Sequence, residues 1–288
     1  MNLPQDQLKA FFEVARLSSF TKAANHLGLT QSALSHRIKN LEGYLATSLF
    51  VRAADGIRLT EAGEKLLKYT RVQSQIESEF INDLKAGPSD KLSGVLRIGG
   101  VSTLMWPIVI PALGKFIRAN PSVQVEMNVR ELAELPSLLQ SGQVDIIITC
   151  GKINRHQYEE VYLGDEVNVL VESKKFDNIP EVYLDHHSED RTTIEYLKIH
   201  DDKVQKLNRS YYDNINGILA AVDAGLGRAV IPIHLLSEYK SLQVVRGERK
   251  LKVPVYLCFL KQPFYSKLHL AAFEVIKKDI PRLLQLQE

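Results

Sequence analysis

The sequence predicts a protein of two parts, a helical N-terminal unit and an α/β unit, joined by one long helix. Apolar residues recur at helical spacing through the first sixty positions, and one helical pattern then runs as far as Gly87-Pro88. Beyond it, short apolar runs alternate with helical segments. The length of 288 residues exceeds that of a typical single domain, and 45% hydrophobic with 24% charged residues is typical of a globular chain.

Three short helices are expected near the N-terminus. Their inner faces carry apolar residues at helical spacing, namely Leu8, Phe11, Phe12 and Ala15 in the first helix and Leu34, Ile38 and Leu41 in the third. Thr21 is expected to cap a second helix over residues 22–27, and Thr30 a third over residues 31–41. Gly28 lies in the turn between these two helices.

A β-hairpin is expected to follow. Asp55-Gly56 favours a tight turn, and it is flanked by short strands over residues 50–52 and 57–59. Residues 1–60 contain seven Lys or Arg and four Asp or Glu, a local excess of positive charge. The whole chain has a net charge of only +2, so bulk charge alone identifies neither a nucleic-acid-binding nor a membrane protein.

One long helix is expected to begin after Thr60 and to run to about Ala86. At 1.5 Å per residue, its roughly 27 residues span ~40 Å. Its apolar stripe consists of Leu66, Tyr69, Val72, Ile76, Phe80 and Leu84. A helix of this length cannot bury such a stripe against a sixty-residue unit, so we expect self-association through residues 61–86, as a dimer or tetramer.

Strands and helices alternate beyond the candidate linker, Gly87 to Asp90. Strands are expected over Val95–Ile98, Val123–Val129, Val144–Thr149, Val167–Val171, Val182–Leu184, Ala229–Ile231 and Val253–Leu260. Helices are expected over Leu104–Arg118, Glu134–Ser141, Ile215–Ala224 and Lys267–Lys278. This alternation predicts βαβ units and a mainly parallel sheet.

Residues 19–41 have the pattern of a helix-turn-helix, whose second helix enters the major groove of DNA. Polar side chains that its core does not need are candidates for base contacts: Gln31, Ser32, Ser35, His36 and Lys39. Others suit phosphate contacts: Thr21, Lys22, Arg37, Arg52 and Arg58. The alternative is an ordinary helical bundle whose polar faces are only solvated.

Further residues extend this pattern over about sixty positions. They are Phe11, the run Ser19-Phe20-Thr21-Lys22-Ala23-Ala24, Leu27, the run Gln31-Ser32-Ala33-Leu34-Ser35, Ile38, Leu41-Glu42, Leu49-Phe50, Arg52 and Leu59-Thr60-Glu61-Ala62-Gly63. Together they resemble the winged helix-turn-helix of LysR-type transcriptional regulators. The chain differs from the family pattern at Ser32, where proline is frequent, and at His36, where arginine is frequent.

The resemblance implies an α/β fold class in which the winged helix-turn-helix and a long linker helix precede a two-lobed, periplasmic-binding-protein-like (type 2) effector domain. The expected division is a DNA-binding domain over 1–60, a linker helix and hinge over 61–90, and an effector domain over 91–288, with lobe I at about 91–164 and 264–288 and lobe II at about 165–263. The implied partners are double-stranded DNA with an inverted-repeat operator, an unknown small-molecule effector between the lobes, a second copy of the chain, and RNA polymerase. The effector would change operator binding or DNA bending by favouring one arrangement of the lobes.

Effector contacts are expected at the carboxyl ends of strands and at the starts of the helices that follow. Ser102 and Thr103 follow the first strand, where they could cap a helix, hold an anion, or do both. The other candidates are Thr149, which ends a second strand, and Asp185, His186 and Tyr211 in the second lobe. For Thr149 and Tyr211, a purely structural role is the alternative.

The sequence offers few signs of an enzyme. Asp185-His186-His187 and His200-Asp201-Asp202 carry metal-ligating side chains, so the alternative function is a small-molecule-binding module or a metal-dependent hydrolase. Gly225-x-Gly227 lacks the third glycine of a dinucleotide site, and there is no phosphate-binding loop or serine-nucleophile motif. We therefore expect no catalytic residues, no metal and no cofactor.

The cellular location is expected to be the cytoplasm. Cys150 and Cys258 are too few for a disulfide framework and fit a reducing compartment as free thiols. The first ten residues lack the apolar core of a secretory signal, and no apolar stretch is long enough to span a membrane.

Overall fold

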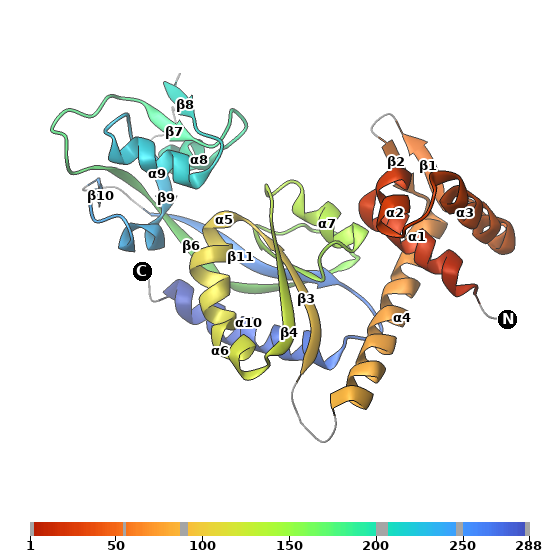
Figure 1. Cartoon of the computed structure of the whole chain (residues 1–288). Coiled ribbons are helices and arrows are strands. Elements are labelled where there is room, and N and C mark those ends of the chain that lie inside the picture. Colours follow the sequence, from red (N-terminus) through yellow and green to blue (C-terminus); the bar gives the residue numbers. More distant parts are fainter. Residues whose placement is uncertain (1–2, 54–55, 87–91, 200–206, 246–249, 286–288) are drawn as a thin grey trace.

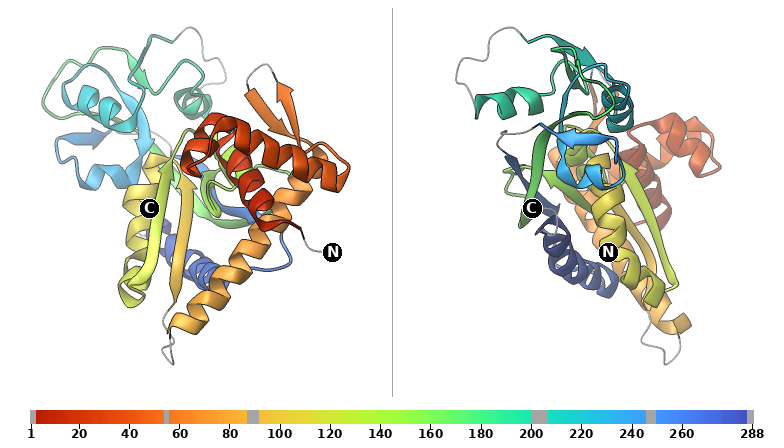
Figure 2. Two further views of the ribbon diagram at one scale, coloured as in Figure 1. Left: turned by 45° about the vertical axis from the view of Figure 1, so that its right-hand side comes forward. Right: turned by 90° about the vertical axis from the view of Figure 1, so that its left-hand side faces the viewer.

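The computed structural model describes residues 3–53, 56–86, 92–199, 207–245 and 250–285. Figure 1 shows the N-terminal unit in red and orange, followed by one long helix and the α/β part. In both views of Figure 2, the teal and cyan part of the chain lies at the upper end of the molecule. The predicted linker, Gly87 to Asp90, lies outside the described residues.

The N-terminal unit contains the three helices and the hairpin that the sequence predicts. They are α1 (Gln5–Leu17), α2 (Phe20–His26), α3 (Gln31–Leu45), β1 (Phe50–Ala53) and β2 (Gly56–Leu59). The rings of Phe11 in α1 and Phe50 in β1 lie 5.3 Å apart, so the hairpin packs against the helical core. The turn residues Ala54 and Asp55 lie outside the described residues, and Gly56 has a φ of 128°, a conformation that favours glycine.

Two helix ends differ from the prediction. Ser19, not Thr21, caps α2: its hydroxyl accepts a backbone hydrogen bond at 3.3 Å, whereas Thr21 is already inside the first turn with its side chain exposed. Helix α3 continues past Leu41 and ends at Ala46, whose left-handed φ of 51° stops it. The predicted cap of α3, Thr30, is confirmed, because its hydroxyl accepts from the α3 backbone at 3.2 Å.

Helix α4 (Glu61–Ala86) is the predicted long helix, and Thr60 caps it by accepting the Gly63 N–H at 3.0 Å. Leu66 and Leu67 are buried against the N-terminal unit. Val72 is half-buried. Five further apolar side chains, which we call the α4 stripe, are exposed: Tyr69, Ile76, Phe80, Ile81 and Leu84. The stripe includes Leu84 at 69% exposure, so α4 buries only its first turns within one chain.

Arg71 joins α4 to the α/β part. Its Nη2 donates to the carbonyl oxygens of Leu139 at 2.9 Å and Gln140 at 2.7 Å, at the C-terminal end of α7 (Leu135–Ser141). Burial lowers the pKa of Arg71 to about 10. Gly142, with a φ of 79°, ends α7, and a Cβ there would lie only 2.6 Å from Arg71 Nε. The glycine is therefore required both by its conformation and by the approach of the guanidinium.

The α/β part is built on one mixed seven-stranded sheet. Its strands are β3 (Ser93–Gly100), β4 (Ser122–Val129), β5 (Ile146–Cys150), β6 (Tyr158–Ser173), β9 (Ala229–Pro232), β10 (Leu242–Val244) and β11 (Leu251–Leu260). Their order is β10-β6-β11-β5-β3-β4, with β9 also paired to β6. Only β3–β4 and β3–β5 are parallel in this sheet, so the prediction of a mainly parallel sheet is wrong.

Strands β6 and β11 explain the difference. They run antiparallel to each other over most of their length and carry the chain from one lobe to the other and back. Here the first lobe comprises β3, β4 and β5 with their helices and α10, and the second lobe comprises β9, β10 and the small parallel pair β7 (Tyr183–Asp185) and β8 (Arg209–Tyr211) with their helices. Such return strands leave no periodic signal that distinguishes them from parallel ones.

The helices of the α/β part are mostly those predicted. They are α5 (Ser102–Leu104), the π-helical segment η1 (Met105–Val109), α6 (Ile110–Ala119), α7, α8 (Thr192–Lys198), α9 (Ile215–Asp223), the 3-10 segment η2 (Ile233–Ser237) and α10 (Lys267–Gln285). The single helix expected over 104–118 is thus interrupted. Pro107 has no N–H to donate to the carbonyl four residues earlier, and a π-helical segment accommodates it. Helix α8 and strands β7, β8 and β10 are short. Of these four elements, the sequence predicted only β7.

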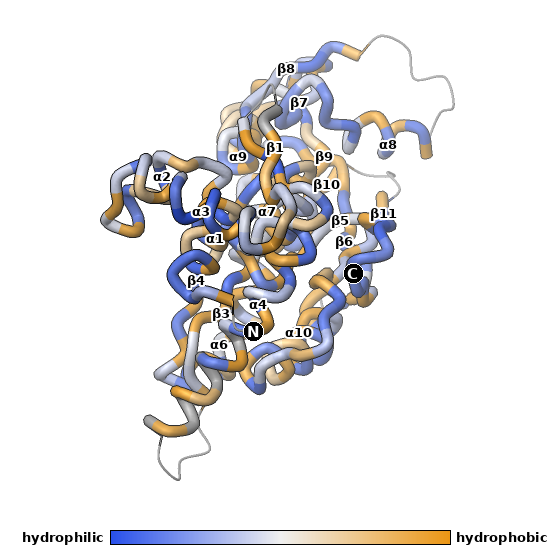
Figure 3. The backbone as a smooth tube through the Cα atoms, turned by 90° about the vertical axis from the view of Figure 1, so that its right-hand side faces the viewer, coloured by the Kyte–Doolittle hydropathy of each residue, from blue (hydrophilic) through white to orange (hydrophobic). Residues whose placement is uncertain are grey.

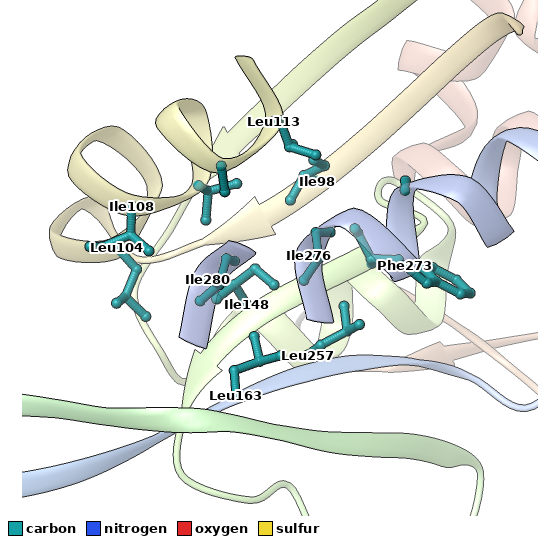
Figure 4. Close-up of a cluster of buried hydrophobic side chains, with 14 of the residues drawn as sticks. Ile98, Leu104, Ile108, Leu113, Ile148, Leu163, Leu257, Phe273, Ile276 and Ile280 are labelled. Atoms are coloured by element: carbon teal, nitrogen blue, oxygen red, sulfur yellow. The ribbon is translucent and has the colours of Figure 1, made fainter. Parts of the chain in front are cut away.

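The core of the first lobe lies between the sheet and two helices. Figure 4 shows Ile98, Ile148 and Leu257 from the strands facing Leu113 and Ile276, which come from α6 and α10. All five side chains are fully buried. The last helix therefore packs on the lobe that the chain built first, as its apolar spacing allows.

Apolar and polar positions are interspersed along the long helices α4 and α10 (Figure 3). None of the described helices combines the length and hydropathy needed to cross a bilayer.

Candidate DNA interface and effector site

The exposed face of α3 carries five of the predicted DNA contacts. At about 100° per residue, Gln31, Ser32, Ser35, His36 and Lys39 fall within an arc of about 140°. Ser35 is half-buried, and the other four are exposed. The buried residues Leu34, Ile38 and Leu41 point to the opposite side, into the core of the unit. Arg37 lies outside the arc and is half-buried.

Local hydrogen bonds orient two of these side chains. The Asn40 amide lies 3.3 Å from Nδ1 of His36 and donates to it, so the neutral ring carries its proton on Nε2. His36 therefore presents a donor beyond the helix surface, which matches an acceptor such as guanine N7 or a phosphate oxygen. The Ser32 hydroxyl pairs with that of Thr30 at 3.0 Å. Sequence reasoning missed Asn40, although its i, i+4 spacing from His36 was a visible signal.

The remaining predicted DNA contacts flank α3. Thr21 and Lys22 are exposed in the first turn of α2, and Arg58 is exposed on β2. Arg52 is on β1, opposite Ile57, and its side chain lies outside the described part of the structure. Lys22 and Arg58 are therefore exposed cations on elements that precede and follow α3 in the chain, and such side chains suit phosphate contacts.

The two lobes meet at Thr103 in α5. The carbonyl oxygen of Thr103 accepts a hydrogen bond from His234 Nε2 at 2.8 Å, and His234 is in η2 of the second lobe. Behind this contact, Glu166 of β6 is 4% exposed. Burial raises the pKa of Glu166 to about 7, against the opposing effect of hydrogen bonds from Thr103, Asn168 and Cys150.

Sequence reasoning found Thr103 at this junction but missed Glu166, Asn168 and His234. Glu166 gave one signal, a carboxylate directly before Val167–Val171, a predicted strand that is apolar except at Asn168. Buried acidic residues in strands are rare unless paired. Nothing in the sequence predicted that His234 contacts this site, because His234 is 131 positions after Thr103.

The other predicted effector residues are dispersed. Ser102 is half-buried beside Thr103, and Thr149 is buried in β5. Asp185 is buried in the second lobe, where the Thr193 hydroxyl donates to it and Arg209 forms an ion pair with it.

His186 and Tyr211 lie beside that buried pair. His186 is half-buried, and Tyr211 is 49% exposed beneath the Arg209 guanidinium, 5.3 Å from the ring centre. Because Asp185 is already bonded within its lobe, the structure favours a structural role for it. The effector roles of Asp185, His186 and Tyr211 stay predictions.

The possible metal site is not assembled in the part of the chain that the structure describes, where no three His, Cys, Asp or Glu side chains converge on one point. His187 Nε2 instead lies 4.0 Å from a carboxylate oxygen of Glu131 in the first lobe. His200, Asp201 and Asp202 lie outside the described residues. The two cysteines are free, and burial raises the pKa of Cys258 to about 12, so this thiol stays protonated.

Comparison with known proteins identifies both parts of the chain. Residues 5–64 match the model of the bacterial regulatory helix-turn-helix protein, lysR family, and residues 89–280 match the LysR substrate binding domain. The HTH-type transcriptional regulator YofA of Bacillus subtilis is 28% identical over 234 residues, covering 78% of this chain and 80% of YofA. The regulator HdfR of Yersinia pestis is 27% identical over 269 residues, covering 88% of this chain and 89% of HdfR.

Solved structures share the fold. ArgP from Mycobacterium tuberculosis superposes with a TM-score of 0.77 at 22% identity, covering 97% of this chain and 98% of ArgP. LysG from Corynebacterium glutamicum, described with bound effector Arg, gives 0.70 at 19% identity, covering 98% of this chain and 99% of LysG. The two family models together cover more than half of the sequence. The chain therefore belongs to the LysR family, as a DNA-binding transcriptional regulator with an effector-binding domain rather than an enzyme.

Proposed function

We propose that this regulator binds an inverted-repeat operator as a homodimer or a dimer of dimers, in the cytoplasm, with residues 1–60, 61–90 and 91–288 as its three functional divisions. The observation that carries the proposal is that the polar face of α3 and the α4 stripe are both exposed on one packed unit. Pairing two α4 stripes buries them and fixes two α3 helices in one geometry. A twofold pair of recognition helices then reads two half-sites about one helical turn of DNA apart.

The DNA contacts divide into two kinds. Gln31, Ser35 and His36 supply amide, hydroxyl and imidazole groups to base edges, with Ser32 and Lys39 beside them. Thr21, Lys22, Arg37, Arg52 and Arg58 position the protein on the phosphates, which carries affinity but no sequence information.

A small-molecule effector binds where the lobes meet, beside Ser102 and Thr103. That LysG, a protein of the same fold, is described with bound effector Arg supports a ligand of this size. Strands β6 and β11 are the only connections between the lobes among the described strands, so a ligand between the lobes changes their angle by bending these strands. Through the Arg71 contact with α7, such a change reaches α4 and hence the spacing of the paired α3 helices.

The test is selection of binding sites from a random double-stranded DNA library by the full-length protein. We expect an enriched sequence with inverted-repeat symmetry, and an affinity whose logarithm falls linearly with the logarithm of salt concentration. Enrichment of single, unrepeated sites would overturn the twofold arrangement. Failure to bind DNA at low salt would overturn the assignment of α3 as the recognition helix.

A further inference from the structure

A buried carboxylate lies where the two lobes meet. Glu166 is in β6, one of the two strands that connect the lobes, and its side chain is 4% exposed. Thr103 and Cys150 face it from the first lobe, and His234 faces it from the second. Elements from both lobes therefore enclose this one acidic group.

Among the residues that the structure describes, no Arg or Lys side chain is bonded to this carboxylate. Its Oε1 is buried without a hydrogen-bond partner. The donors that do reach the carboxylate are neutral: the side chains of Thr103 and Asn168, and the thiol of Cys150, a weak donor 3.9 Å from Oε2. His234 Nε2 is 3.9 Å from Oε1, but it donates its hydrogen bond to the Thr103 carbonyl. An ionised carboxylate removed from water is costly unless a cation and hydrogen bonds compensate it.

Asp185, the other buried acidic residue, shows how this protein stabilises a carboxylate that is removed from water. Asp185 and Glu166 are the two fully buried Asp or Glu side chains among the described residues. Asp185 is bonded to the guanidinium of Arg209 and to the hydroxyl of Thr193. In the described part of the chain, Glu166 has no such arginine or lysine, so its burial serves something other than an ion pair with one of these residues.

We propose that Glu166 is the counter-ion for the cationic head of the effector, an ammonium or guanidinium group, bound between the lobes. The inference rests on the proposed effector site and names the ligand class for it. Thr103 and the side-chain amide of Asn168 supply neutral polar groups around the bound head. The sequence suggested that Ser102 and Thr103 could hold an anion. The structure favours a cation there instead, because α5 is too short, at three residues, to bind an anion at its N-terminus, and because the carboxylate of Glu166 lies next to it.

Access to Glu166 requires the lobes to part. His234 must leave the Thr103 carbonyl, and the connecting strands β6 and β11 are the elements that can bend. A cation that pairs with Glu166 therefore binds one arrangement of the lobes better than the other. This differential affinity is what an effector needs in order to shift the equilibrium between them.

Proton exchange is a consequence of this pairing. The pKa of Glu166 is about 7, because it is buried, and a bound cation requires the ionised form. The titratable groups that face Glu166 are the Cys150 thiol, whose pKa is itself raised by burial, and the imidazole of His234. Below pH 7, affinity for a monocation should therefore fall by up to about tenfold per pH unit, since binding must release a proton.

The test is isothermal calorimetry on the full-length protein with four probes, putrescine, agmatine, L-lysine and L-arginine, and with L-glutamate as the anionic comparison. We expect at least one cation to bind, L-glutamate not to bind, and Glu166→Gln to weaken the binding at least tenfold. The control is Glu159→Gln, which removes an exposed carboxylate from the same strand and should leave binding unchanged. Absence of binding by all four cations, or equal binding to Glu166→Gln, would overturn the proposal.

Two further measurements separate this inference from its alternatives. If Glu166 only holds His234 in place, Glu166→Gln should lower the melting temperature, whereas an uncompensated carboxylate predicts an unchanged or higher one. Operator binding without cation should be the same in the wild type and in the control Glu159→Gln. If the wild-type protein binds operator DNA but none of the cations, the proposal of a cationic effector is wrong and the proposed function still stands. If the wild-type protein does not bind operator DNA, the proposed function itself is wrong.

Discussion

The carbonyl oxygen of Thr103 in the first lobe accepts a hydrogen bond from His234 Nε2 of the second lobe at 2.8 Å. In an uninterrupted α-helix, the N–H of residue 107 would donate to this oxygen, but Pro107 has none. A proline in one lobe thus leaves an acceptor available to the other. The hydrogen bond between the lobes therefore depends on Pro107, four residues after Thr103, and on His234, which is distant in the sequence.

Replacing His234 by Ala should loosen this contact between the lobes. Loss of one net hydrogen bond costs about 1 kcal/mol, which corresponds to a roughly fivefold increase in opening. Hydrogen–deuterium exchange should therefore accelerate in residues 102–109 and 229–237. His156→Ala, an exposed histidine in the first lobe, is the control. Unchanged exchange in both segments would show that the contact does not hold the lobes together.

The stability of the protein should depend on pH through Glu166. Its pKa rises from an ordinary value of 4.5 to about 7 on folding, because burial disfavours the charged form. The folded state then holds a proton that the unfolded state has lost between pH 4.5 and 7, so this group destabilises folding as pH rises. The difference reaches about 3 kcal/mol above pH 7.

Urea unfolding of wild type and Glu166→Gln at pH 5, 6, 7 and 8 measures this contribution. The variant should gain stability relative to wild type as pH increases from 5 to 7, and the difference should level off above pH 7. If the free energies of unfolding of the two proteins changed in parallel with pH, the surrounding groups would be stabilising the ionised carboxylate of Glu166.

Introducing a charge into the α4 stripe should prevent self-association. Phe80 is 63% exposed in the single chain, and burying it against a second copy contributes on the order of 2 kcal/mol. Phe80→Glu removes that contribution and adds a charge that the interface would have to desolvate. Analytical ultracentrifugation should show a monomer, and operator affinity should fall at least a hundredfold. Lys68→Ala, a change on an exposed part of the same helix, should do neither.

Two substitutions on the DNA interface should differ in kind. His36→Ala removes a donor from the base-reading face and should change the preferred base at one position, at a cost of about 1–3 kcal/mol. Lys22→Ala removes a phosphate contact, so it should weaken all sequences alike and reduce the salt slope by about 1. Fluorescence anisotropy with a set of single-base operator variants distinguishes the two. An equal loss of discrimination in both variants would contradict the division of contacts proposed for α3 and α2.

Arg71→Ala should uncouple the effector domain from α4. The substitution removes two charge-assisted hydrogen bonds to the C-terminal end of α7 and leaves the carbonyls of Leu139 and Gln140 without this donor. We expect a stability loss of about 2 kcal/mol and operator binding that no longer responds to effector. Arg71→Lys is the control for charge, since lysine keeps the charge but lacks the planar guanidinium. An intact effector response in Arg71→Ala would place the coupling elsewhere.

Local patterns in the sequence were sufficient for much of this protein. The inner faces of α1 and α3, the cap at Thr30 and the length of α4 each follow from residues within a few turns of one another, and so does the polar face of α3. The resemblance to LysR-type regulators rests on the same local runs. The Ser19 cap was misassigned because Ser19 and Thr21 offer the same hydroxyl within two positions, and only the backbone conformation selects between them.

The site proposed here for the effector depends on tertiary structure. Thr103, Glu166 and His234 are far apart in the sequence, and antiparallel return strands bring them together in a sheet that periodicity alone suggested to be parallel. Burial is what distinguishes Glu166 from the other acidic residues of β6. Sequence spacing specifies which side of a helix or strand is apolar, but the cost of desolvating a charge depends on which distant elements enclose it.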